Sequence, residues 1–152
     1  MCTSFLSELM TATHNFGTAP TRGTGAADTF KAALYLASAT YDASTTAYSA
    51  TGEVSGSGYT AGGVTVTNAT PPANTNTSAT AGVGYWTPSA SIVYTGVTLT
   101  TAFDAMLMYN STQPDKAVAV FTFGSQTITS GNFTLTMPSN TTSTALLRLS
   151  TT

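Results

Sequence analysis

Charged side chains are scarce in this chain of 152 residues, of which only 7% are Asp, Glu, Lys or Arg; an average soluble domain has about 25%. The four basic residues are scattered, so they form neither the phosphate-neutralising patch that nucleic acid requires nor a cluster that binds anionic lipid. The longest apolar runs are far shorter than the roughly 20 residues of a membrane span. We therefore expect neither nucleic acid nor a membrane as a partner.

Cysteine and histidine each occur once, as Cys2 and His14. One cysteine excludes an internal disulfide, and one residue of each type cannot build a Cys/His metal cluster. No acid or nucleophile stands at a spacing from His14 that suggests a catalytic partner, so we expect it on the helix surface or near the helix C-terminus. The first ten residues lack a basic segment and include Glu8, which is not typical of a signal peptide. The sequence predicts synthesis inside the cell and no metal, cofactor or catalytic residue.

Hydroxyl side chains stand where charges are missing, and Thr alone makes up about a fifth of the chain. The formal net charge of -2 gives little repulsion between copies. Strands that expose Thr, Ser, Ala and Gly tend to self-associate unless their edges are covered. The composition thus indicates a protein that works within an assembly of like copies.

Residues 3–16 show the one clear helical period of the chain. The side chains on the apolar stripe are Phe5, Leu6, Leu9, Met10, Thr13 and Phe16. Thr3 or Ser4 is expected to cap the start of this helix, and Gly17 suits the left-handed position after its last turn. About three turns of helix are marginal alone, so the stripe must pack on the chain itself or on a neighbour. We expect a helix or arm over 1–17 and a single β domain over 18–152.

Alternation of apolar and polar residues predicts strands in most of the remainder. The expected strands cover 30–38, 64–70, 85–100, 102–110, 116–124, 125–138 and 143–150. A turn is expected at 110–116, where Asp115 follows Pro114, and a second hairpin connection at 130–132. Short strands with turn residues between them predict a mainly β protein: an antiparallel β-sandwich, or a jelly-roll-like fold, with one N-terminal helix.

The glycine-rich segment GSGYTAGG at 56–63 does not have the spacing of a phosphate-binding GxGxxG loop, and no helical pattern follows it. Its glycines are expected in turns or bulges. Glu53 stands just before this segment in an uncharged stretch, where its carboxylate must find N–H groups, a base or water. We expect Glu53 to bond the glycine-rich loop rather than to act as a catalytic acid.

Aromatic residues are distributed through the chain, and they are equally suited to a carbohydrate platform, a protein interface or a core. Interfaces use aromatic and aliphatic anchors. The residues that we expect at an interface are Phe5, Leu6, Leu9, Met10, Tyr48, Tyr59 and Trp86.

Most of the chain resembles one family. The opening CTSFLSELMTATHNF, and the later DTFKAALYLASATYDASTTAYSATGEVSGSGYTAGG, are similar to small structural proteins of tailed bacteriophages, as are AFDAMLMYN, KAVAVFTFG and GNFTLTMP in the second half. The segment 71–90 matches least. The resemblance implies a non-enzymatic virion protein, and some such proteins resemble the capsid decoration (cement) proteins, which are β-sandwich or jelly-roll oligomers on the capsid lattice.

The resemblance also implies partners and a location. We expect this chain to bind the major capsid protein and other copies of itself, as a dimer or trimer, on the capsid surface after synthesis in the bacterial host cytoplasm. It supplies no catalytic residue and no small-molecule substrate. Two alternatives stay open: a tail or neck component of the virion, and a carbohydrate-binding β-sandwich module. An enzyme is the least favoured interpretation.

Overall fold

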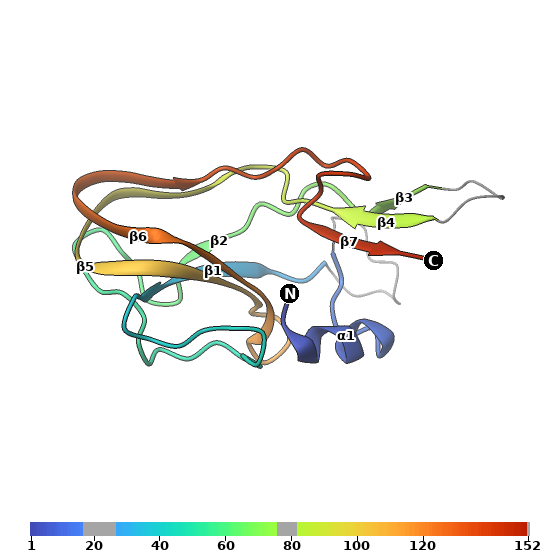
Figure 1. Ribbon diagram of the computed structural model, residues 1–152, viewed down its shortest axis with the longest axis horizontal. Coiled ribbons are helices and arrows are strands. Elements are labelled where there is room, and N and C mark those ends of the chain that lie inside the picture. Colours follow the sequence, from blue (N-terminus) through green and yellow to red (C-terminus); the bar gives the residue numbers. More distant parts are fainter. Residues whose placement is uncertain (17–26, 76–81, 152) are drawn as a thin grey trace.

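The computed structural model describes residues 1–16, 27–75 and 82–151. These residues contain one helix, α1 (Thr3–Met10), and the strands β1 (Phe30–Leu36), β2 (Val64–Thr65), β3 (Ala73–Asn74), β4 (Val83–Trp86), β5 (Ile92–Asn110), β6 (Lys116–Leu135) and β7 (Leu147–Ser150). The strands form two antiparallel sheets, of order β2-β1-β5-β6 and β3-β4-β7 (Figure 1). The predicted mainly β, antiparallel fold with one N-terminal helix is confirmed.

The hairpin of β5 and β6 builds most of the large sheet. The two strands have 19 and 20 residues, and the predicted turn after Asn110 joins them. Their register shifts at several points, and the ribbon curls back over itself (Figure 1). One arm of the folded hairpin consists of the parts of β5 and β6 that lie next to the turn. The other arm consists of 92–100 and 128–135. The arms face each other, since the Tyr94 hydroxyl on one donates to the Ala32 carbonyl beside the other at 2.9 Å.

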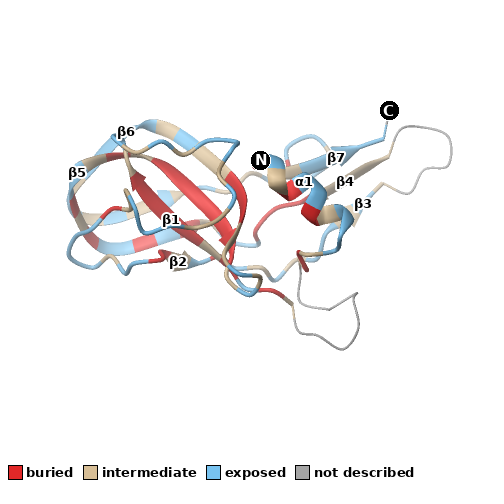
Figure 2. Ribbon diagram, turned by 90° about the horizontal axis from the view of Figure 1, so that it is seen from below, coloured by how far each residue is buried: buried red, intermediate tan, exposed pale blue. Residues whose placement is uncertain are grey.

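The core therefore lies between the two arms of one folded hairpin, in a sandwich-like arrangement. Phe103 and Phe133 come from opposite arms and meet edge to face, with their ring centroids 5.1 Å apart. Burial of large side chains such as these is the main stabilising contribution to a domain of this size. In Figure 2 the buried residues follow β1 and the neighbouring part of the hairpin close to its turn.

Several predicted boundaries differ from the observed ones. The expected break near residue 101 is absent, because β5 runs through it. The expected hairpin at 130–132 is wrong: Gly131, with φ of 148°, lies inside β6 at an irregularity, and the Asn132 side chain accepts a hydrogen bond from the Gly96 N–H at 2.8 Å. Glycine here bends the ribbon instead of ending it.

Two predicted strands are shorter than expected. The strand expected over 64–70 is only β2, and the one expected over 143–150 is only β7. Both lie at sheet edges, where a strand has one neighbour at most.

The helix also ends earlier than predicted. It stops at Met10, and Ala12 follows with a positive φ of 54°. Cys2 occupies the N-cap position without a side-chain cap, so neither Thr3 nor Ser4 plays that role. Gly17, the predicted C-terminal glycine, lies outside the described residues. No helix in the part of the chain that the structure describes is long and apolar enough to cross a membrane.

Candidate interaction surface around the N-terminal helix

The N-terminal helix is fixed to the β-structure at its start. The Cys2 N–H donates to the Val118 carbonyl of β6, and the Thr3 N–H donates to the Ala43 carbonyl, both at 2.9 Å. Helix α1 buries Phe5 and Glu8, and Phe5 packs against the rings of His14 and Phe16, with centroid distances of 4.8 and 6.1 Å. A helix of eight residues is too short to be stable alone, so these contacts hold it in place.

An aromatic cluster joins the helical segment to both sheets. Phe16 stacks on Phe30 of β1 at a centroid distance of 4.5 Å and packs against Trp86 of β4 at 4.7 Å. The Trp86 Nε1–H donates to the Thr70 carbonyl at 2.9 Å. This cluster, which consists of Phe5, His14, Phe16, Phe30 and Trp86, fixes the small sheet and α1 on the end of the large sheet.

A buried polar network lies beside the aromatic cluster. The His14 Nε2 is 2.9 Å from Glu8 Oε2, and the Glu8 Oε1 is 3.3 Å from the Lys116 ammonium. On its other side the imidazole meets Asn110, whose Nδ2 is 3.0 Å from His14 Nδ1 and 2.7 Å from Asp28 Oδ2. Asp28 also accepts the Asn15 N–H at 2.8 Å. The network therefore ties the helix, the segment after it and the end of β5 together.

The orientation of Asn110 determines the histidine tautomer. The Asn110 Oδ1 accepts the N–H groups of Thr112 and Gln113 at 3.1 and 3.2 Å, so its amide nitrogen must face His14 and Asp28. An amide nitrogen only donates, which leaves His14 Nδ1 as the acceptor and puts the hydrogen on Nε2, facing the Glu8 carboxylate. The prediction that His14 sits on a helix surface or at its end was wrong: the residue is buried, beyond the helix, and both ring nitrogens are bonded.

An apolar groove runs between α1 and the small sheet. Its volume is about 290 Å³, and its lining includes Met1, Leu9, Phe16, Leu147 and Leu149. Leu149 on the edge strand β7 is 51% exposed. Apolar surface of this kind, next to polar side chains such as Arg148, is typical of sites that bind another molecule.

The outer side of α1 carries two further exposed apolar side chains. Met10 is 84% exposed and Leu6 is 47% exposed, whereas the opposite side of the helix buries Phe5 and Glu8. The helix therefore packs one side against the protein and exposes apolar side chains on the other side. We call Leu6, Met10 and the groove residues Leu9 and Leu149 the helix surface.

The seven residues predicted at an interface fall into three groups. Leu6, Leu9 and Met10 lie on the helix surface, where the interface prediction stays a prediction. Phe5, and Trp86 with 2% exposure, lie in the aromatic cluster, so they stabilise the protein's own core. The structure places Tyr48 and Tyr59 around Glu53 instead, where both are only partly buried.

Glu53 does bond the glycine-rich loop, as its uncharged surroundings predicted. Its Oε1 accepts the Gly62 N–H at 2.8 Å and the Tyr59 hydroxyl at 2.6 Å, and its Oε2 accepts the Tyr48 hydroxyl at 2.7 Å. Burial, together with the Glu53 carboxylate, raises the pKa of both tyrosines above the ordinary value. Burial and the nearby carboxylates of Asp115 and Glu53 raise the pKa of Tyr109 to about 12.

The polar network was not predicted from the sequence. Glu8 and His14 are six residues apart, which is not a helical spacing, and Asn110 is remote in sequence. The sequence did contain a signal, since Glu8 stands within an apolar stretch and a carboxylate that becomes buried there needs partners. Nowhere in the described ranges do three or more His, Cys, Asp or Glu side chains form a group suited to a metal ion.

Comparisons with known proteins give no match: no family model, no curated protein and no solved structure is similar to this chain at a significant level.

Proposed function

We propose that this chain is a non-enzymatic structural protein of a tailed-bacteriophage virion, and that it is a decoration protein that binds the assembled capsid. The observation that carries the proposal is the helix surface, where Leu6 and Met10 project from a helix that is itself fixed by the aromatic cluster and the polar network. Exposed apolar side chains on a rigid support are what a protein interface uses. We propose the capsid as the partner because the sequence resembles phage structural proteins.

The proposed mechanism is thermodynamic linkage. A protein that binds the assembled shell but not its free subunits stabilises the shell by mass action. Many copies on one lattice give a large total effect even when each contact is weak. Because Leu6, Leu9, Met10 and Leu149 are uncharged, this binding should depend little on salt.

The test is incorporation into virions. Met10→Asp and Leu6→Asp each place a carboxylate on the helix surface, and both should lower the amount of this protein per particle, measured by quantitative mass spectrometry against the major capsid protein. Ser7→Asp is the matched control, since Ser7 is exposed on the same helix and makes only a local bond to the Ser4 carbonyl. Incorporation of the two apolar-site variants at the level of Ser7→Asp would contradict the proposal.

The same measurement separates the two virion locations. A copy number comparable to that of the major capsid protein supports decoration, and a few copies per particle support a tail or neck component. A glycan array tests the carbohydrate-binding alternative; there, Trp86 offers no stacking face, because it is buried in the aromatic cluster.

A further inference from the structure

The groups around the His14 imidazole fit its neutral form only. The ring is fully buried, its Nδ1 lies 3.0 Å from the Asn110 amide nitrogen, and its Nε2 lies 2.9 Å from the Glu8 carboxylate. A protonated imidazole donates from both nitrogens and accepts at neither. A proton on Nδ1 would therefore point at another donor, the NH₂ group of Asn110.

The Asn110 side chain is not able to turn and receive that proton without loss. A half-turn of its amide would put Oδ1 against Asp28 Oδ2, where a donor now meets an acceptor at 2.7 Å. It would also put the amide nitrogen against the N–H groups of Thr112 and Gln113, which Oδ1 now accepts. One new bond to His14 would thus break three existing ones.

The charged groups around the ring do not remove this conflict. Glu8 of α1 faces Nε2, Asp28 lies beyond Asn110, and the Lys116 ammonium at the start of β6 is 3.3 Å from the other Glu8 oxygen. The two carboxylates would attract an imidazolium, but Glu8 already accepts the Nε2–H of the neutral ring. The added proton goes on Nδ1, and the group that faces Nδ1 is the Asn110 amide.

His14 belongs to a segment that is held on the β-structure from several points. Residues 1–16, which we call the N-terminal segment, contain a helix too short to be stable alone. Backbone bonds at Cys2 and Thr3, the rings of Phe5 and Phe16, and the polar network hold it. A terminal segment of this kind opens locally while the core stays folded.

We propose that the N-terminal segment is a pH-sensitive switch, which is closed on the β-structure while His14 is neutral and is released in mild acid. A histidine in water gains its proton near about pH 6.5. A proton that binds the released form and not the closed form shifts the equilibrium towards release. The contribution of His14 to the closed form is therefore fully present above about pH 7 and decreases as the pH falls below about 6.5.

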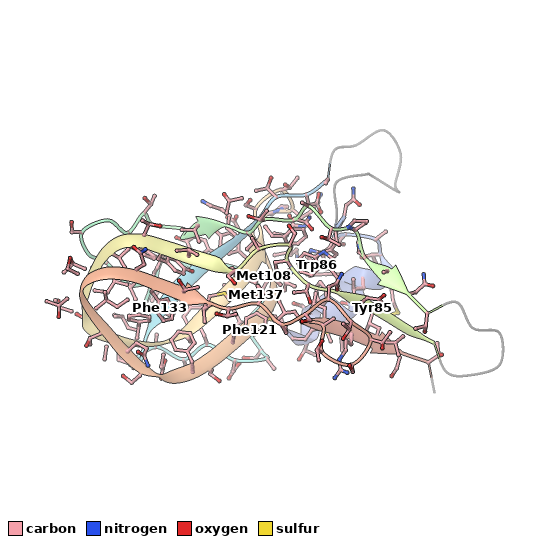
Figure 3. The ribbon with its side chains drawn as sticks, turned by 90° about the horizontal axis from the view of Figure 1, so that it is seen from above. Tyr85, Trp86, Met108, Phe121, Phe133 and Met137 are labelled. Atoms are coloured by element: carbon pink, nitrogen blue, oxygen red, sulfur yellow. The ribbon has the colours of Figure 1, made fainter. Side chains whose placement is uncertain are left out.

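Release of the segment exposes apolar surface. Phe5, Leu9 and Phe16 line the groove beside the small sheet, so the groove loses one wall when they leave. Phe16 also leaves Trp86, which lies where the small sheet meets the large sheet (Figure 3). The switch thus couples pH to the exposure of apolar side chains, and the inference does not rest on the virion function.

The test is amide hydrogen exchange of the purified full-length chain, followed by NMR at about pH 7.5 and about pH 5.5 and corrected for the intrinsic exchange rate at each pH. The Thr3 and Asn15 N–H groups report on the segment, because they donate to the Ala43 carbonyl at 2.9 Å and to Asp28 Oδ2 at 2.8 Å. Their protection factors should be about tenfold lower at the acid pH, which is the increase in the released form that one histidine gives when it titrates near about pH 6.5 only after release.

Two variants separate titration from a general loosening of the segment. His14→Gln keeps a donor and an acceptor but gains no proton in this range, so its protection factors should differ by less than about twofold between the two pH values. It leaves every other titratable group in place. Glu8→Gln is the matched control: loss of the charge beside Nε2 should lower protection at both pH values, while the histidine that remains keeps the ratio at about tenfold.

The wild type supplies a second measurement, because His14 is the only histidine of the chain and its ring nitrogens are identified directly by NMR. The closed form should contain the neutral ring, with hydrogen on Nε2, at both pH values. An imidazolium in the closed form at the acid pH overturns the proposal. So does a wild-type ratio no larger than that of His14→Gln.

The Val54 N–H, which donates to the Leu34 carbonyl at 3.0 Å in the core, shows whether release is local. It should be better protected than the Thr3 and Asn15 N–H groups at both pH values. Equal protection of all three would mean that the segment opens only when the whole fold does, and it would refute the switch. None of these measurements involves virions, so their outcome is separate from that of the incorporation test.

Discussion

The reactivity of the Cys2 thiol can be used to measure how firmly α1 is held on the β-structure. It is the only cysteine of the chain, it is fully buried, and it stands at the N-cap of the helix. Burial also raises its pKa, so the reactive thiolate is scarce until the segment opens. The rate of labelling by an aromatic disulfide reagent should therefore follow the equilibrium for opening the N-terminal segment.

Glu8→Ala should increase that rate. The substitution removes the 2.9 Å bond to His14 and the 3.3 Å contact with Lys116, and it leaves the buried Nε2–H without an acceptor. A hydrogen bond to a charged group contributes about 1.5–3 kcal/mol, and the half-exposed lysine adds little. A loss of about 2–3 kcal/mol corresponds to roughly 30- to 160-fold faster labelling.

The control for this prediction is Ser7→Ala, which changes an exposed hydroxyl on the same helix and should alter labelling less than about threefold. Glu8→Gln keeps an oxygen for His14 but loses the charge, so its rate should fall between the two. If Glu8→Ala labels as slowly as Ser7→Ala, the polar network does not hold the helix and the reasoning is refuted.

Three further predictions concern the rest of the fold. Tyr48→Phe removes one of three donors to Glu53 and should lower the free energy of unfolding by about 1–2 kcal/mol in urea titrations, whereas an unchanged midpoint would show that this bond is not stabilising. Gly63→Ala should cost at least about 3 kcal/mol or prevent folding, because φ is +72° and a Cβ there would lie 1.6 Å from the Ala32 carbonyl oxygen; soluble, cooperatively melting protein with a normal midpoint would contradict this. Stability should fall from about pH 9 towards 12, because the unfolded chain loses the Cys2 proton near pH 9 and the Tyr109 proton near pH 10, whereas folding raises the pKa of both groups, that of Tyr109 to about 12; thermal melts with no decline above pH 10 would exclude the effect.

The local parts of the fold could be predicted from the sequence. The alternation in 30–38 identified β1, and Pro114 followed by Asp115 identified the turn between β5 and β6, where Asp115 adopts a positive φ of 52°. Glu53 was predictable for a similar reason, since a carboxylate in an uncharged stretch must bond what lies near it, and the glycine-rich loop follows directly.

The features that depend on distant residues could not be predicted. The helical stripe continues to Phe16 in sequence, but the chain leaves the helix after Met10 so that His14 reaches Glu8 and Phe16 reaches Trp86. Tertiary packing of this kind overrides a local period. The location of Trp86 also depends on distant residues. An aromatic residue in a short strand is equally suited to an interface and to a core, and only the tertiary fold determines which of the two it joins.

Because the chain is synthesised from its N-terminus, the pairing of β1 with β5 affects the order in which the elements can fold. Phe30 pairs with Asn110, and Cys2 bonds Val118, so the first strand and the N-terminal helix both wait for partners that leave the ribosome much later. Long-range pairings of this kind fold slowly and leave apolar strands uncovered during synthesis. We expect the β5–β6 hairpin, whose strands are neighbours in sequence, to form first and to serve as the template on which β1 and finally α1 assemble.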